Sequence, residues 1–263
     1  MMKKGSFHEY AYSVGDEEGL VITGYSGNKT RPAIPKKMNG TKVTGIGNSA
    51  FYGCHSLITA KIPKSVSSIG NSAFYGCHSL IKAEIPKSVT SIGNSAFSNC
   101  RSLSKITIPE HVSHIGIFAF NGCRNLTDIT VDKRNSTYDS RDHCNAIIAT
   151  KTNQLIVGCC NTKIPDSVSS IGDRAFSGCR DLKEISIPEG VSDIGDFAFE
   201  GCTGLTEITL PESVTAIGNF AFERCRSLTN LVLPVPDGML CIKRNAFKDC
   251  FALCILASDE RKT

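Results

Sequence analysis

The chain has 263 residues, of which 41% are hydrophobic, so its composition is that of a folded protein. It contains no run of about 18–20 apolar residues that could span a membrane, and we expect no membrane span. The net charge is +4: residues 1–131 carry 14 Lys/Arg and 7 Asp/Glu, and residues 132–263 carry 15 and 18. No dense basic stripe with interleaved aromatic residues occurs, so we expect no nucleic-acid binding.

Residues 1–33 do not follow the pattern of the rest of the chain, and we expect them to form an N-terminal cap. Their first 20 residues lack the apolar run of a signal peptide. The run from Gly19 to Gly24 predicts a strand, and the following Tyr25–Asn28 predicts a turn. A cap is needed because the open end of a stack of repeats exposes apolar core and unpaired strand edges.

From residue 34 onwards the chain repeats with a period of 23 residues, the step from Pro86 to Pro109. A fixed period of 20–50 residues is typical of stacked-repeat folds. Regular coils also begin at Pro63, Pro165, Pro188 and Pro211, and eight Ala-Phe pairs indicate eight coils. The first coil is lengthened around Lys37–Thr41, where we expect a longer turn.

Each coil is expected to contain one strand, one shorter extended segment and one turn. Ile106 and Ile108 lie two residues apart and therefore point to one face of a strand, and Pro109 ends that strand. The Ala-Phe pair is expected on a helical or 3-10 turn with Phe in the core. The residue after the coil's glycine is then the N-cap of that turn: Asn48, Asn71, Asn94, Asp173, Asp196 and Asn219.

Residues 132–163 interrupt the period. Ala146–Ala149 and Gln154–Val157 predict two strands around the turn Thr150–Asn153, so we expect a β-hairpin insertion. The resulting organisation is a single solenoid domain over residues 1–263, with the cap at 1–33, four coils at 34–131, the insertion at 132–163, four coils at 164–257 and a tail at 258–263. No coil can bury its inner face alone, so stability must come from stacking.

Thirteen cysteines suggest disulfides, but their placement argues against them. Eight occupy the same repeat position: Cys54, Cys77, Cys100, Cys123, Cys179, Cys202, Cys225 and Cys250. Equivalent residues of stacked coils lie roughly 4.8 Å apart with parallel Cα–Cβ vectors, which do not converge for a disulfide. We therefore predict a ladder of packed thiols, and we expect no metal because no coil offers the paired cysteines of a zinc site.

Three groups of residues could carry other chemistry, and for each we prefer a structural interpretation. His111 and His114 lack a partner at metal-ligand spacing, so they indicate an exposed loop pair. Asp142, His143 and Cys144 contain nucleophile-like types, and the alternative function that they offer is an enzyme that uses the insertion. Neighbours on an extended segment point to opposite faces, so Cys144 is expected to pack in the hairpin. Cys159-Cys160 could form a vicinal disulfide.

The outward face of the predicted sheet is the more informative set, because its residues are not needed for the core. Solenoids use such faces to bind proteins. The candidate binding residues are Lys61, Lys82, Glu84, Lys105, Thr107, Asp128, Thr130, Glu184, Glu207 and Thr209. A second stripe could bind glycans or other acidic ligands: His55, His78, Arg101, Arg124, Arg180 and Arg226.

The consensus L-x-x-I-x-I-P-x-x-V-x-x-I-G-x-x-A-F-x-x-C closely resembles the BspA-like (Treponema-type) leucine-rich repeats, over roughly Ile34–Ile255. The resemblance implies a right-handed solenoid of about eight coils, mainly β, with a parallel sheet. It implies a bacterial cell-surface or secreted protein that binds a protein ligand, such as a host-matrix or bacterial surface protein, and in some relatives acts as an adhesin. It implies no catalytic residues and no cofactor, so we expect a non-enzymatic binding module, and we expect a monomer.

Overall fold

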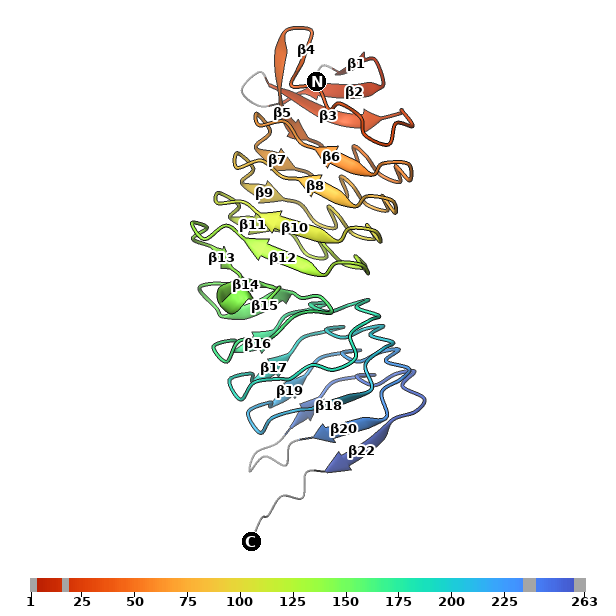
Figure 1. Cartoon of the computed structure of the whole chain (residues 1–263), viewed down its shortest axis with the longest axis vertical. Coiled ribbons are helices and arrows are strands. Elements are labelled where there is room, and N and C mark those ends of the chain that lie inside the picture. The colour runs from red at the N-terminus through yellow and green to blue at the C-terminus, as the bar shows by residue number, and fades with distance from the viewer. Residues whose placement is uncertain (1–3, 16–18, 234–239, 258–263) are drawn as a thin grey trace. The chain divides into compact units, whose positions relative to one another are not determined.

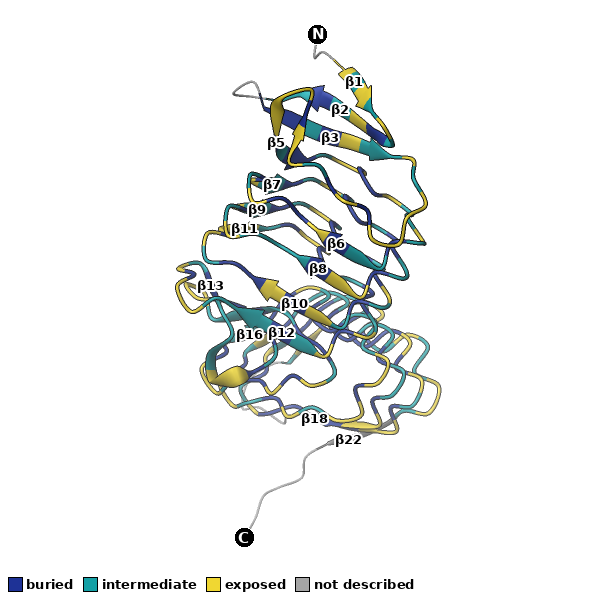
Figure 2. Cartoon of the chain, turned by 45° about the horizontal axis from the view of Figure 1, so that its top comes forward, coloured by how far each residue is buried: buried dark blue, intermediate teal, exposed yellow. Residues whose placement is uncertain are grey.

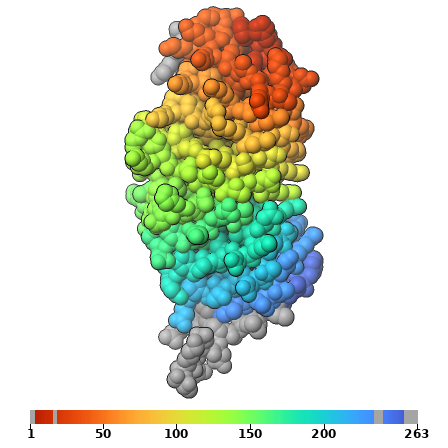
Figure 3. Space-filling view, in the orientation of Figure 1, coloured from red at the N-terminus to blue at the C-terminus, as the bar shows by residue number. Residues whose placement is uncertain are grey.

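The computed structural model describes residues 4–15, 19–233 and 240–257. It confirms the predicted fold: a leucine-rich-repeat β-solenoid of about nine turns with parallel sheets and almost no helix (Figure 1). The chain forms two compact units. The first comprises Met1–Leu126 with Val131–Thr137, and the second comprises Thr127–Thr130 with Tyr138–Thr263. In each unit, the side chains of successive coils fill adjacent layers (Figure 3).

The first unit begins with three antiparallel strands, where the sequence predicted a single strand and a turn. Strands β1 (Lys4–Phe7), β2 (Tyr10–Val14) and β3 (Leu20–Tyr25) pair in that order, and β3 then pairs in parallel with β5 (Thr41–Ile46). The lengthened first coil is itself a hairpin, because β4 (Lys37–Met38) pairs with β5 across a turn in which Asn39 and Gly40 have φ of 48° and 83°. Two consecutive positive φ values are those of the tight turn that Asn-Gly favours.

Each regular coil of the first unit contributes one strand to each of two parallel sheets. One sheet continues from β5 through β7 (Ser68–Ile69), β9 (Ser91–Ile92) and β11 (His114–Ile115). The other contains β6 (Thr59–Lys61), β8 (Lys82–Glu84) and β10 (Lys105–Ile108). Strand β12 (Asp128–Val131) follows where the chain passes between the two units.

The second unit opens with the predicted hairpin. Strands β13 (Tyr138–Asp139), β14 (Ile147–Ala149) and β15 (Gln154–Val157) are antiparallel, and β15 starts a parallel sheet with β16 (Ser170–Ile171), β17 (Asp193–Ile194), β19 (Ala216–Ile217) and β21 (Cys241–Ile242). A 3-10 turn, η2 (Arg141–His143), precedes β14. A second parallel sheet contains β18 (Glu207–Thr209), β20 (Asn230–Leu233) and β22 (Cys254–Ala257).

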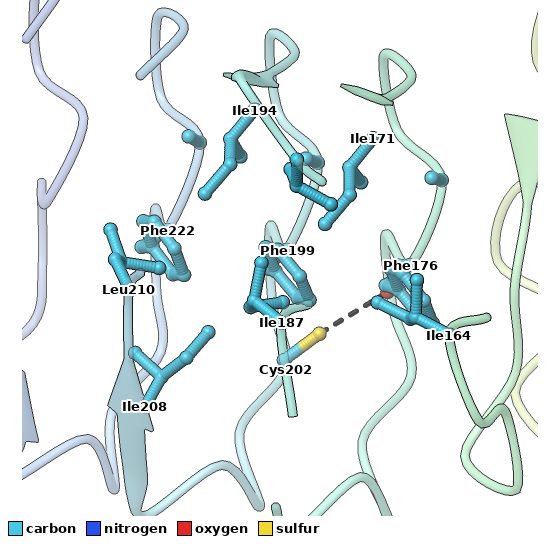
Figure 4. Packing of buried hydrophobic residues seen from close by; sticks show 14 of the residues in the cluster. Ile164, Ile171, Phe176, Ile187, Ile194, Phe199, Cys202, Ile208, Leu210 and Phe222 are labelled. Atoms are coloured by element: carbon cyan, nitrogen blue, oxygen red, sulfur yellow. Dashed lines mark hydrogen bonds between the residues drawn. The ribbon is translucent and has the colours of Figure 1, made fainter. Parts of the chain in front are cut away.

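Phenylalanines one period apart form the centre of each core. The rings of Phe74 and Phe97 lie 5.1 Å apart and are nearly parallel, and Phe176 and Phe199 repeat this at 5.0 Å. Figure 4 shows Phe176, Phe199 and Phe222 in line, with Ile171 and Ile194 beside them. Because each ring packs against the next coil, the core is continuous within a unit although no coil has a core of its own.

In the described structure the repeated cysteines form no disulfides, and five of the eight are buried, in agreement with the predicted ladder of packed thiols. These thiols also form hydrogen bonds that could not be inferred from the sequence. Cys100 Sγ donates to the Phe74 carbonyl oxygen at 3.1 Å, and Cys202 Sγ donates to Phe176 at 3.2 Å (dashed line in Figure 4). A thiol at this position therefore fills the core and also satisfies a buried carbonyl of the preceding coil.

The prediction of N-capped helical turns was wrong. Ser72 and Ser95, which follow the presumed N-cap residues, have φ of 53° and 54°, so the segment is a series of tight turns and not a helix. The Asn and Asp side chains bond to the next coil instead. Asn48 Oδ1 accepts from the backbone N–H of Asn71 at 2.8 Å, and Asp173 Oδ1 accepts from that of Asp196 at 2.8 Å. These residues join coils and do not cap a helix.

Candidate binding surfaces

The first candidate surface is the outer face of β6, β8 and β10. Ala60, Ala83 and Ile106 point into the core, so the residues on either side of each point outward. The strand registers place Lys82 beside Lys105 and Lys61 beside Glu84. Exposed parts of these strands are yellow in Figure 2, and the structure thus brings five predicted binding residues together on one face: Lys61, Lys82, Glu84, Lys105 and Thr107.

This face is electropositive. Lys82 Nζ lies 2.9 Å from Glu84 Oε1 on the same strand, and both side chains are solvent-exposed. The hydrogen bond from Lys82, with a smaller contribution from the charge of Lys61, lowers the pKa of the Glu84 carboxyl below its ordinary range. With Lys105 the face therefore carries three lysines against one carboxylate, and the exposed ion pair itself contributes little to stability.

The other five predicted residues lie in the second unit. Asp128 and Thr130 are half-buried on β12, and Glu207 and Thr209 are exposed on β18. Glu184 is exposed, but the segment Lys183–Ile187 that carries it does not form the expected strand. The sheet predicted to run through this coil is therefore interrupted there.

A hollow of about 1130 Å³ lies over this interruption. The repeat pattern did not predict this hollow. Its floor includes Ile164, Ile187 and Ile208, and its walls carry four carboxylates and two lysines. These charged residues are Asp181, Glu184, Glu189, Glu207, Lys163 and Lys183.

The hollow lies where two successive coils separate, between two backbone hydrogen bonds that join them. Thr206 N–H donates to the Lys183 carbonyl at 3.1 Å, and Thr215 N–H donates to the Ser192 carbonyl at 2.8 Å. Between these bonds, no backbone hydrogen bond joins Glu184–Ile187 to β18 in the described structure. The equivalent segments β6 and β8, and β18 and β20, do pair with each other.

The cysteines and histidines singled out from the sequence do not form a common site in the described structure. Cys144 is buried in the core while Asp142 and His143 are exposed, which confirms Cys144 as a packing residue. Cys159 and Cys160 form no vicinal disulfide in the described structure. His111 Nδ1 lies 3.1 Å from the Lys87 carbonyl oxygen, whereas His114 is exposed on β11.

The second stripe is ordered in the first unit. The rings of His55 and His78 stack with their centroids 4.7 Å apart. Tyr52 and Tyr75, three residues earlier in each coil, stack in the same way at 5.1 Å. Arg101 is exposed and Arg124 is half-buried. Arg180 and Arg226 are exposed in the second unit.

Six copies of the BspA-type leucine-rich repeat region match residues 37–148 and 157–258. The chain belongs to the BspA-type leucine-rich repeat family. Residues 149–156, which the matches omit, fall in the hairpin formed by β14 and β15. No curated protein sequence matches this BspA-type chain. No helix in the described part of the chain is long and apolar enough to cross a membrane.

Several solved structures resemble this BspA-type protein. The T. pallidum leucine-rich repeat protein is 30% identical, with a TM-score of 0.54, over 86% of this chain and 91% of its own. A leucine-rich repeat protein from Bacteroides ovatus is 26% identical, with a TM-score of 0.61, over 96% and 70%. A leucine-rich cell surface protein from Faecalibacterium prausnitzii shares the fold at 23% identity and a TM-score of 0.57, over 98% and 96%.

Proposed function

We propose that this chain is a non-enzymatic interaction module of a bacterial cell surface, which binds a protein ligand through the outer face of its parallel sheets. One observation carries the proposal: Lys61, Lys82, Lys105 and Thr107 on β6, β8 and β10 are exposed on a regular scaffold. Extended faces of this kind are the surfaces that solenoid proteins use for recognition. The fold shared with a leucine-rich cell surface protein supports the location.

The charge of this face indicates the type of ligand that it favours. Three lysines surround the single carboxylate of Glu84, so an acidic patch of a protein partner would be attracted and oriented. A ligand that contacts Lys61, Lys82 and Lys105 together must follow three neighbouring strands. The face therefore favours an extended contact over a small-molecule pocket.

The test compares two variants with equal changes in charge. Replacing Lys61, Lys82 and Lys105 by Glu reverses the face, and replacing the exposed Lys64, Lys87 and Lys133 by Glu reverses three lysines outside those strands. Wild type and both variants are exposed to immobilised extracellular-matrix proteins and to bacterial surface proteins. We expect the first variant to lose at least tenfold in affinity and the second to retain it. If the first variant keeps every partner, the sheet face is not the binding surface.

A second candidate function is glycan binding by the His/Arg stripe. The observation that favours it is the stacked pair Tyr52 and Tyr75, in which Tyr52 is 59% exposed beside the stacked His55 and His78. Exposed aromatic faces offer apolar contact area with a polar tip. Loss of glycan-array binding by Tyr52→Ala with no change for Lys82→Glu would favour this function. If the wild-type protein binds no glycan on the array, glycan binding is excluded.

A further inference from the structure

The interrupted sheet of the second unit has unused backbone groups. In the first unit, Ile62 N–H donates to the Glu84 carbonyl at 3.2 Å, and in the second Leu210 N–H donates to the Val232 carbonyl at 3.0 Å. The equivalent bond would join Ile187 N–H to the Thr209 carbonyl, and in the described structure it is not formed. Hence β18 pairs with β20 on one side only.

Ile187 and Thr209, which carry these groups, both line the hollow. Glu184, Ser186, Glu207 and Thr209 are exposed, and all four line the hollow. The coils at Ile62 and Leu210 satisfy these groups with the neighbouring strand, and an exposed strand edge is a template for pairing with another chain. The volume of about 1130 Å³ slightly exceeds the range of roughly 300–1,000 Å³ that is usual for small-ligand sites, which suits a longer ligand.

The charge of the residues that line the hollow indicates what kind of strand would pair there. Four carboxylates face two lysines, so the hollow has a net charge of −2 (2 − 4). The carboxylates of Glu184 and Glu207 point outward on their segments, while Ile185 and Ile208 point inward. An added strand would place alternate side chains beside the glutamates and the others above the isoleucines, because side chains alternate between the two faces of a strand.

We propose that the hollow over Lys183–Ile187 and β18 binds an extended peptide segment of a protein partner by strand addition. Its sequence alternates Lys or Arg with aliphatic residues. Main-chain hydrogen bonds to the free edge supply affinity, and the alternating side chains supply specificity. The proposal rests on the proposed function as a protein-binding module and names a ligand class for its second unit. It involves none of the lysines of the first unit.

The test uses a labelled six-residue peptide, acetyl-Thr-Lys-Ile-Lys-Ile-Thr-amide, with wild-type protein and fluorescence anisotropy. Two control peptides separate charge from strand addition: one with Glu in place of both Lys, and one N-methylated at both Ile, which removes two backbone donors. We expect the wild type to bind the first peptide at least tenfold more tightly than either control. Equal binding of the N-methylated peptide would overturn strand addition, and equal binding of the Glu peptide would overturn the charge assignment.

Protein variants locate the site. Glu184→Lys with Glu207→Lys should weaken peptide binding at least tenfold, whereas Asp166→Lys with Glu212→Lys, an equal change outside the hollow, should leave it unchanged. In wild-type protein, hydrogen exchange of the amides at 184–187 should slow on adding peptide, a readout that needs no variant. Unchanged exchange, or protection that rises with protein concentration alone because copies pair with each other, would overturn the proposal. Neither result would affect the Lys61, Lys82 and Lys105 test.

Discussion

The side-chain oxygen Oδ1 of Asn71 accepts a hydrogen bond from the backbone N–H of Asn94, one coil further along the chain, at 2.8 Å. The same contact joins Asn48 to Asn71 and Asn94 to Ile117. A row of polar side chains therefore connects coil to coil at the edge of the first unit. In the second unit Asp173 and Asp196 occupy equivalent positions and make the same contact.

The first prediction concerns this row. Asn71→Ala should lower the free energy of unfolding by about 1 kcal/mol, because one hydrogen bond is lost and the Asn94 N–H is left without its acceptor. Asn71→Asp should keep most of the stability, since Asp173 shows that a carboxylate can accept the same bond. Urea denaturation of the three proteins measures this. An Ala variant as stable as wild type would mean that solvent replaces the bond without cost.

The second prediction concerns the phenylalanine row. Phe97 is fully buried between Phe74 and Phe120, with ring centroids 5.1 and 5.6 Å away. Phe97→Ala should therefore create a cavity and lower the free energy of unfolding by about 3–5 kcal/mol. Phe97→Leu, which fills more of the space, should cost less. Calorimetry on both variants tests the order, and an unchanged melting temperature for the Ala variant would contradict the stacked core.

The third prediction concerns thiol reactivity. Burial raises the pKa of the Cys123 thiol to about 12 and that of Cys144 to about 11. Since the thiolate is the reactive form, both should resist iodoacetamide at pH 8 in the folded protein. Cys241 is exposed and should be alkylated first. Mass spectrometry of the labelled peptides gives the order, and rapid labelling of Cys123 would show that the core opens or that the thiol ladder is misplaced.

The fourth prediction concerns His78. Partial burial, followed by the charges of Arg101 and His55, lowers its pKa from the ordinary 6.5. The folded chain therefore disfavours the imidazolium. The stability associated with neutral His78 is present above pH 6.5 and is lost as the pH falls through the lowered pKa. NMR titration should show a pKa below 6.5 that rises in Arg101→Ala, and a pKa that does not move would exclude Arg101 as a cause.

Periodicity alone predicted much of this structure, because a constant 23-residue step fixes which side chains stack. The Phe and Cys rows follow from that step without further information. The role of Asn71 could not be inferred in the same way. An Asn that follows a glycine suits an N-cap as well as a bond to the next coil, and only the positive φ of Ser72 shows that no helix follows.

The hollow could not have been predicted, since its coil has an ordinary sequence. Lys183–Ile187 reads KEISI and the next coil reads TEITL over Thr206–Leu210, so both fit the strand pattern equally well. Only the second forms a strand. The difference therefore lies in the three-dimensional arrangement and not in the strand pattern of either segment. The predicted site residues Glu184 and Glu207 thus border a hollow where an unbroken sheet was expected.

The open strand edge can be tested directly by hydrogen exchange of single amides in the free protein. Ile62 and Leu210 donate to the neighbouring coil, whereas Ile187 at the equivalent position does not. We predict that the Ile187 amide exchanges much faster than those of Ile62 and Leu210, and that it slows on addition of the Lys-Ile peptide. Equal protection of all three amides in the free protein would show that the sheet is closed at this coil and would contradict the account.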